Sequence, residues 1–93
     1  MDFDWDERKS ARCRAERGFS FADTLPAFSD PDRIVDDDLR FEYGEPRFRV
    51  YGRIEGRLFV IAFTMREGVY RIISARKANK REVRRYEKSQ TQK

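Results

Sequence analysis

Three apolar segments that follow one another between residues 47 and 76 restrict the fold more than any other feature of this sequence. Residues 47–54 alternate between apolar and mostly basic side chains, which predicts a strand with one basic face. Residues 58–65 are apolar on both faces and predict a central strand, and residues 69–76 follow as a third strand. Glu55-Gly56 and Glu67-Gly68 supply the turns, so we expect an antiparallel meander.

The residues before the meander begin with a predicted helix from about Trp5 to Arg17. Asp4 and Glu7 have the spacing of a capping box, and acidic side chains favour a helix N-terminus. Gly18 can adopt the left-handed conformation that commonly ends a helix. We therefore expect this helix to be the first element of the chain.

A second helix is expected after Ser20, where apolar residues recur at helical spacing. Pro26 falls inside it and removes a backbone hydrogen bond, so this helix should be short, kinked or partly 3₁₀. Residues 33–35 can form a short strand. Residues 36–38 are three consecutive aspartates, whose mutual repulsion predicts a solvated loop.

From Ala78 onward the sequence favours a helix, in which only Ala78, Val83 and Tyr86 offer an apolar edge. The elements together predict one α+β domain over residues 1–93, with two N-terminal helices, a four-stranded mainly antiparallel sheet and a C-terminal helix. We expect the basic strand face and the last helix to border one groove, while both early helices cover the other side of the sheet.

Charge is divided unevenly along the chain. Residues 1–45 carry seven basic and thirteen acidic side chains, a net −6, whereas residues 46–93 carry fourteen and four, a net +10. A basic surface attracts nucleic acid or an acidic protein, and the alternative is a solvated surface without such a partner. The start of the chain does not resemble a signal peptide, and no apolar run approaches the roughly 20 residues that span a bilayer. We expect a cytoplasmic protein without membrane contact.

The types of residue present exclude several chemistries. The sequence has no histidine, which excludes imidazole catalysis, and it has only one cysteine. The aspartates of residues 36–38 could hold a divalent metal ion, but adjacent side chains diverge, so we expect neither a metal site nor a cofactor. Arginines remain as candidates. RNA brings its own nucleophile, the 2′-OH, and cations held on strands can stabilise the charge that develops on its phosphate. The alternative for each arginine is a solvated surface charge.

Arg71 and Arg76 are the strongest candidates, yet their odd spacing places them on opposite faces of an ideal strand. A bulge between them, or a strand that ends before Arg76, would bring both to one face. Together with Arg47, Arg49 and Arg66 they would then surround one phosphate.

Several short motifs occur in register along the chain, and the most specific is Arg71-Ile72-Ile73-Ser74-Ala75-Arg76. With Trp5-Asp6, Gly18-x-Ser20-Phe21, Gly44-Glu45-x-Arg47 and Thr64-x-Arg66, the chain resembles the BrnT family of toxins over roughly residues 3–87. The resemblance implies a RelE-like fold, a ribonuclease that arrests translation, and neutralisation by the DNA-binding antitoxin BrnA.

The chain departs from the family pattern at the end of the first helix. Where the family usually has Asn, Lys and His, this sequence has Cys13, Glu16 and Arg17. If the missing lysine or histidine serves catalysis, the protein is weakened or inactive. If the segment only closes the helix over the sheet, Arg17 and Gly18 can substitute and activity survives.

The residues and the resemblance lead to a set of expected roles. Catalysis is assigned to Lys9, Arg71 and Arg76, supported by Glu45, Glu82 and Tyr86 as orienting groups or proton carriers. Further RNA contacts are assigned to Arg47, Arg49, Arg66, Lys77, Lys80, Arg81 and Arg84. The alternatives are a salt bridge for Lys9, a hairpin ion pair for Glu45 and core packing for Tyr86.

The leading hypothesis is a metal-independent endoribonuclease toxin whose partners are RNA and a BrnA-like antitoxin, and whose toxin–antitoxin complex binds operator DNA. One rival is a non-catalytic nucleic-acid-binding module, and another is a degenerate toxin that acts through its antitoxin complex. The sequence leaves open the RNA sequence that is cut and whether cleavage takes place on the ribosome.

Overall fold

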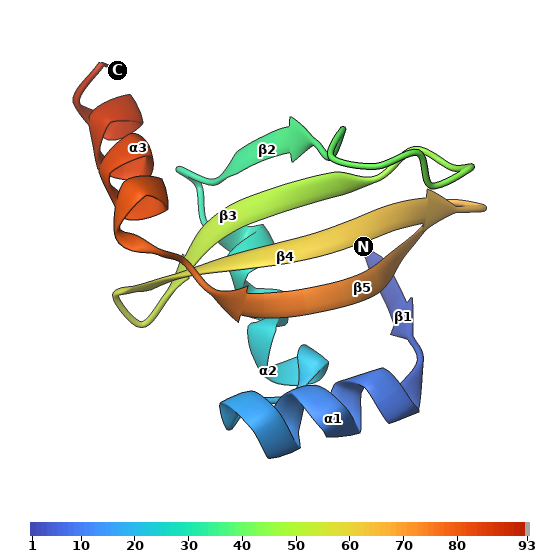
Figure 1. Cartoon of the computed structure of the whole chain (residues 1–93). Helices are drawn as coiled ribbons and strands as arrows, with labels where there is room; N and C mark the ends of the chain where they lie inside the picture. The colour runs from blue at the N-terminus through green and yellow to red at the C-terminus, as the bar shows by residue number, and fades with distance from the viewer. Residues whose placement is uncertain (93) are drawn as a thin grey trace.

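The computed structural model describes residues 1–92, which form a five-stranded sheet and three α-helices (Figure 1). The elements in chain order are β1 (Asp2–Trp5), α1 (Glu7–Arg17), α2 (Phe21–Thr24), the 3₁₀ helix η1 (Leu25–Ser29), β2 (Ile34–Asp37), β3 (Phe48–Ile54), β4 (Arg57–Arg66), β5 (Val69–Lys77) and α3 (Lys80–Thr91). The sheet order is β1-β5-β4-β3-β2, with β1 parallel to β5 and the other pairs antiparallel. The predicted α+β class is confirmed, but the sheet has one strand more than predicted.

The additional strand is β1, which lies before the first helix. Asp6, and not Asp4, caps α1, because its carboxylate accepts hydrogen bonds from the backbone N–H groups of Arg8 and Lys9. Because α1 begins only after Asp6, residues 2–5 lie outside the helix and pair with β5, which is far away in the sequence. At the opposite edge of the sheet, β2 extends over Asp36 and Asp37, which were expected in a loop.

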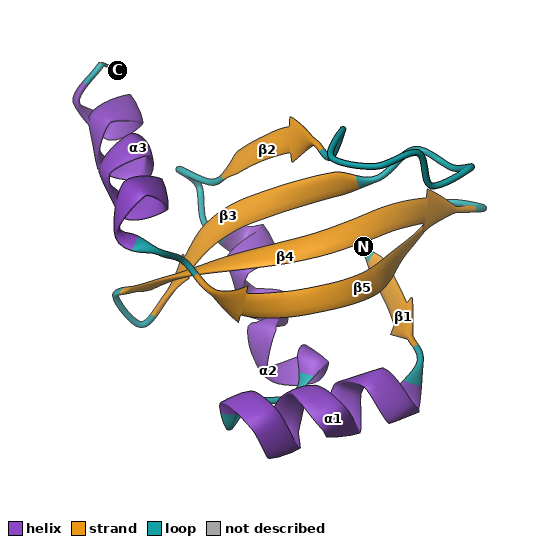
Figure 2. Cartoon of the chain, viewed as in Figure 1, coloured by secondary structure: helices purple, strands orange, loops and turns teal. Residues whose placement is uncertain are grey.

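The predicted meander is confirmed as β3, β4 and β5, joined by two tight turns. Both turns use Glu-Gly, and all four residues have positive φ, between 49° at Glu55 and 82° at Gly56. Two successive positive φ values are the geometry that matches the twist of a hairpin. Figure 2 shows that the β2–β3 connection, residues 38–47, is a much longer loop than these turns.

The first two helices and η1 cover one face of the sheet, which we call the helix-side face. Its buried apolar cluster includes Phe21 and Phe28 from the helices and Val50, Ile61 and Ile72 from the strands. The expectation for the second helix is confirmed, since α2 has four residues and continues as η1 with Pro26 in its first turn.

The close approach of η1 to the sheet depends on a glycine in β3. A Cβ atom added at Gly52 would lie 2.1 Å from the backbone oxygen of Ala27, a distance that real side chains do not tolerate. Glycine is therefore required here by space rather than by backbone conformation.

Helix α3 packs against the other face of the sheet, which confirms the predicted separation of the early helices from the last one (Figure 1). A smaller cluster forms there from Tyr51, Leu58, Val60 and Tyr86. A capping box between Asn79 and Glu82 begins α3. Within residues 1–92, no helix is long and apolar enough to cross a membrane.

Candidate active site on the arginine face

The central part of β5 contains an irregularity that decides where its arginines point. Ile72 pairs with Phe63 of β4, but Ser74 pairs with the neighbouring Ala62, so Ile73 is an extra residue in β5. The register shift is a β-bulge, and it reverses the side-chain alternation between Arg71 and Arg76.

As a result, Arg71 and Arg76 lie on the same face of the sheet. Arg71 is opposite Thr64 and Arg76 is opposite Val60. Thr64 and Val60 are four residues apart in a regular strand and share a face, as do directly opposed residues of antiparallel strands. Arg49 of β3 pairs with Ala62 and belongs to that face as well. We call this surface, defined by Arg49, Arg71 and Arg76, the arginine face.

Arg76 is held by the first turn of α3. Its two terminal nitrogens donate to the two carboxylate oxygens of Glu82 at 2.8 and 2.9 Å, and the backbone N–H of Asn79 donates to the same carboxylate. The hydrogen bond from Arg76 is the main cause that lowers the pKa of Glu82. Glu82 is therefore ionised at neutral pH, which favours an orienting role over that of a proton carrier.

Arg71 is paired with the strand that the sequence analysis missed. Its Nη1 lies 3.4 Å from Oδ1 of Asp4, the residue directly opposite it in β1. The Arg71 side chain remains 30% exposed, so its guanidinium can still reach a bound anion.

Arg49 differs from the other two arginines, because its Nε is buried and has no hydrogen-bond partner among the described residues. The half-buried side chain lies near the Tyr51 ring, with 5.9 Å between its Cζ and the ring centre. Within residues 1–92 it also forms no ion pair. Arg49 is thus a half-buried cation whose side chain forms neither a hydrogen bond nor an ion pair within the described residues.

Three carboxylates interact electrostatically with Arg49, but none of them forms an ion pair with it. The pKa values of Asp36, Asp38 and Glu82 are each lowered, chiefly by hydrogen bonds from Arg85, Arg40 and Arg76 respectively, and the charge of Arg49 adds to the lowering. Arg85, which the sequence analysis did not select, donates to Asp36 from both terminal nitrogens at 2.6 and 2.8 Å. Each neighbouring carboxylate therefore already has its own arginine.

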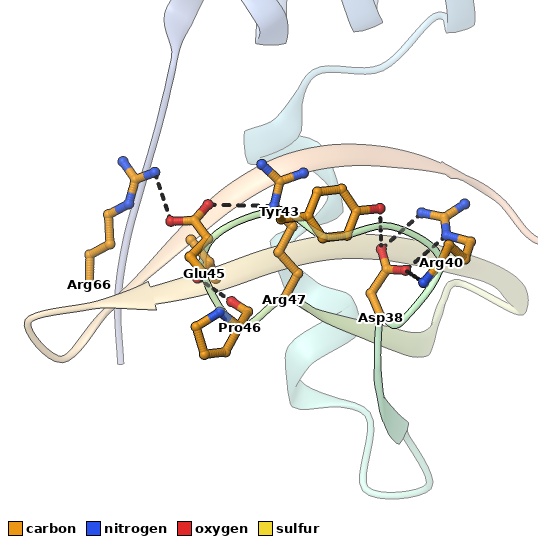
Figure 3. A network of polar contacts seen from close by, with 8 residues as sticks. Asp38, Arg40, Tyr43, Glu45, Pro46, Arg47 and Arg66 are labelled. Atoms are coloured by element: carbon orange, nitrogen blue, oxygen red, sulfur yellow. Dashed lines mark hydrogen bonds and ion pairs between the residues drawn. The ribbon is translucent and has the colours of Figure 1, made fainter.

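A second polar network lies where the β2–β3 loop meets β4 (Figure 3). Glu45 accepts from Nε of Arg47 at 3.4 Å and from Nη2 of Arg66 at 3.2 Å, so it bridges two of the predicted RNA-binding arginines. Tyr43 stacks under Arg47, with 3.9 Å between the guanidinium carbon and the ring centre. The placement of Glu45 agrees both with an orienting role and with a hairpin ion pair.

The remaining predicted RNA contacts lie at the end of β5 and on α3. Lys77, Lys80, Arg81 and Arg84 are all exposed, and none forms an ion pair within the described chain. They are free to attract a polyanion.

Tyr86 lies in the core and Lys9 lies on α1. Tyr86 is 1% exposed and its hydroxyl donates to Asp30, and burial followed by this hydrogen bond raises its pKa to about 12. That placement favours the core-packing alternative. Lys9 is exposed on α1 and lines a hollow with Ile73 and Ser74 beside β5.

Two of the three positions that depart from the resembled family, Cys13 and Arg17, attach α1 to β5. The Sγ of Cys13 lies 3.6 Å, and Nη1 of Arg17 2.7 Å, from the backbone oxygen of Ala75, and both donate to it. Burial raises the pKa of the Cys13 thiol, so it stays protonated. This geometry favours the reading in which the segment closes the first helix over the sheet.

No group of three or more metal-ligating side chains converges within residues 1–92. The aspartates of residues 36–38 diverge, since Asp36 pairs with Arg85 of α3 and Asp38 with Arg40 of the loop.

Comparison with known protein families finds a match over most of the chain. Residues 5–82 match the family described as the ribonuclease toxin, BrnT, of type II toxin-antitoxin systems. The matched range includes β5 with its bulge, all three arginines of the arginine face and Glu82. No curated protein matches the chain with significant similarity.

Proposed function

The chain belongs to the BrnT family of ribonuclease toxins of type II toxin–antitoxin systems, and on that premise we propose that it cleaves RNA on the arginine face without a metal ion. In this proposal the 2′-oxygen bonds to phosphorus, the bond from phosphorus to the 5′-oxygen breaks, and the products carry a 2′,3′-cyclic phosphate and a 5′-hydroxyl. Water takes the 2′ proton and supplies one to the departing oxygen.

The observation that carries the proposal is the β-bulge at Ile73, which brings Arg71 and Arg76 to the same face as Arg49. Attack by the 2′-oxygen increases the negative charge on the phosphate oxygens. Fixed guanidiniums stabilise that state more than the ground state, because they do not need to reorganise as the charge develops. Glu82 and Asp4 keep two of the three in place.

The carboxylates on this face act as orienting groups rather than general bases. Asp36 and Glu82 have lowered pKa values, each because of the arginine hydrogen-bonded to it, and are ionised well below neutral pH. A general base tuned to neutral pH would give a bell-shaped rate profile. We instead expect the cleavage rate to rise steadily with pH across the neutral range.

A toxin of a type II system has a cognate antitoxin, and we infer that this partner is a BrnA-like DNA-binding protein. The free cations Lys77, Lys80, Arg81 and Arg84 support RNA binding and also favour an acidic antitoxin surface. An antitoxin that covers them would block RNA, and the resulting complex would bind operator DNA through the antitoxin.

The proposal is tested with the purified full-length toxin and a single-stranded RNA in EDTA. Cleavage should persist, should leave 2′,3′-cyclic phosphate or 3′-phosphate ends, and should stop when the cut site carries a 2′-O-methyl group. Arg76→Ala should lower the rate by about 10²–10³, the usual loss for one donor to a developing charge. Arg14→Ala removes an exposed arginine on α1 and should change little.

Two results would overturn this mechanism. Loss of cleavage in EDTA with recovery in Mg²⁺ would show that a metal ion takes part. RNA binding by the wild-type protein without any cleavage would support a non-catalytic module or a degenerate toxin instead.

A further inference from the structure

The β2–β3 loop, residues 38–47, exposes large apolar side chains of a kind that is usually buried. Leu39 is 84% exposed and Phe41 is 69% exposed, and the loop lines a hollow of about 630 Å³. Isolated exposed apolar residues are common on surfaces, but two of them beside a hollow indicate a binding surface.

The loop is fastened at both ends, so these side chains are presented by a fixed frame. Asp38 is 3% exposed and receives two hydrogen bonds of 2.9 Å from Arg40, and its backbone N–H donates to the carbonyl of Arg47 at 2.7 Å. At the other end, the Thr64 hydroxyl donates to the Pro46 carbonyl at 2.6 Å. A loop held in this way loses little conformational entropy when a ligand binds.

Planar side chains contact one another in this loop. The Phe41 and Tyr43 rings meet edge to face with 5.8 Å between their centres. The Arg47 guanidinium stacks on the Tyr43 ring. Aromatic rings and guanidinium planes are the surfaces on which proteins stack unpaired bases. Phe41 keeps most of its ring free for such a contact.

The loop borders the arginine face. Thr64, which fixes Pro46, is the residue opposite Arg71 in the sheet. Arg47 directly precedes β3, two residues before Arg49. A nucleotide whose phosphate lies against the arginines would therefore place its neighbouring base toward the loop.

We propose that residues 38–47 form a subsite for an unpaired RNA nucleobase next to the scissile phosphate, with Phe41, Tyr43 and Arg47 as the stacking surface. This inference rests on the proposed function. A protein partner is disfavoured as the occupant, because Leu39, Phe41 and Tyr43 alternate with charged residues and leave no continuous apolar patch.

The subsite can be tested without cleavage. Fully 2′-O-methylated oligoribonucleotides, each with one fluorescent 2-aminopurine at a different position, are titrated with the full-length toxin. One position should show strong quenching, the signature of stacking. Phe41→Ala and Tyr43→Leu should abolish the quenching and weaken binding at least about fivefold, since one stacked base typically contributes that much or more. Tyr43→Phe keeps the ring and should retain the signal.

The outcomes separate this inference from the proposed function. Quenching that disappears in the two variants while the wild type fails to cleave RNA would support the subsite and overturn the catalytic proposal. Quenching that persists in both variants, with circular dichroism showing them folded, would overturn the subsite. Variants that lose antitoxin binding but keep RNA affinity would also overturn it and assign the loop to a protein partner.

Discussion

The two faces of the sheet use the same strands for different purposes. The helix-side face is closed by α1, α2 and η1, and its strand residues Val50, Ile61 and Ile72 are at most 1% exposed. The arginine face is covered by α3 only at one end, and its three arginines differ in their degree of pairing. We therefore expect stability to depend mainly on the helix-side face and RNA cleavage mainly on the arginine face.

The largest effect is expected from the helix-side face. Phe28 is 4% exposed and contacts the rings of Phe3, Phe63 and Tyr70 edge-on or nearly so. Phe28→Ala should lower the free energy of unfolding by about 3–5 kcal/mol, measured by urea denaturation. The matched control is Phe41→Ala, which removes an exposed ring and should stay within about 0.5 kcal/mol of the wild type. Similar losses in both variants would show that stability does not depend mainly on the helix-side face.

On the arginine face, Arg49→Ala should show the reverse pattern. We expect the cleavage rate to fall by about 10²–10³, because Arg49 is the arginine whose donors are not already used by a carboxylate. The urea midpoint should change little, since no hydrogen bond of Arg49 is lost. Single-turnover kinetics and unfolding curves of the same preparation measure both quantities. A stability loss as large as that of Phe28→Ala would show that Arg49 is structural.

The smallest effect concerns acid stability. The two hydrogen bonds from Arg40 lower the pKa of Asp38 from 3.8 to about 2. A depressed folded-state pKa means that this stabilisation is fully present above about pH 4 and is lost as the pH falls toward 2. Arg40→Gln should therefore lower stability most at pH 7, and its difference from the wild type should shrink as the pH falls toward 2, which flattens the dependence of stability on pH. The loss at pH 7 should be modest, because the Arg40 side chain is half exposed to solvent. Thermal unfolding between pH 2 and pH 7 measures the difference.

The sequence predicts those parts of the fold that are determined by residues close to one another in the chain. The meander follows from alternation and two Glu-Gly turns, and the shortening of the second helix follows from Pro26. Strand β1 was not predicted, because its partner strand is distant in the sequence and its acidic residues are also typical of a helix N-terminus. The match of residues 5–82 confirms the resemblance to the BrnT family that the motifs indicated.

Prediction of the site was limited by geometry that no residue type encodes. The sequence shows that a bulge would bring Arg71 and Arg76 together, but nothing marks Ile73 as the inserted residue. The position of Tyr86 along α3 is compatible with core packing and with a catalytic role. Its burial and its hydrogen bond to Asp30 favour core packing. Arg49 has no ion pair because the nearby carboxylates, which come from three other segments, are each paired with another arginine.

The pairing of β1 with β5 also has a consequence for timing during synthesis. Asp4 lies far before its partner Arg71 in the chain, and Glu82, which fixes Arg76, follows later still. A growing chain therefore cannot hold both arginines in place until the residues through Glu82 have emerged from the ribosome that makes it. In the proposed function, the arginine face would become able to cleave RNA only after that point in synthesis.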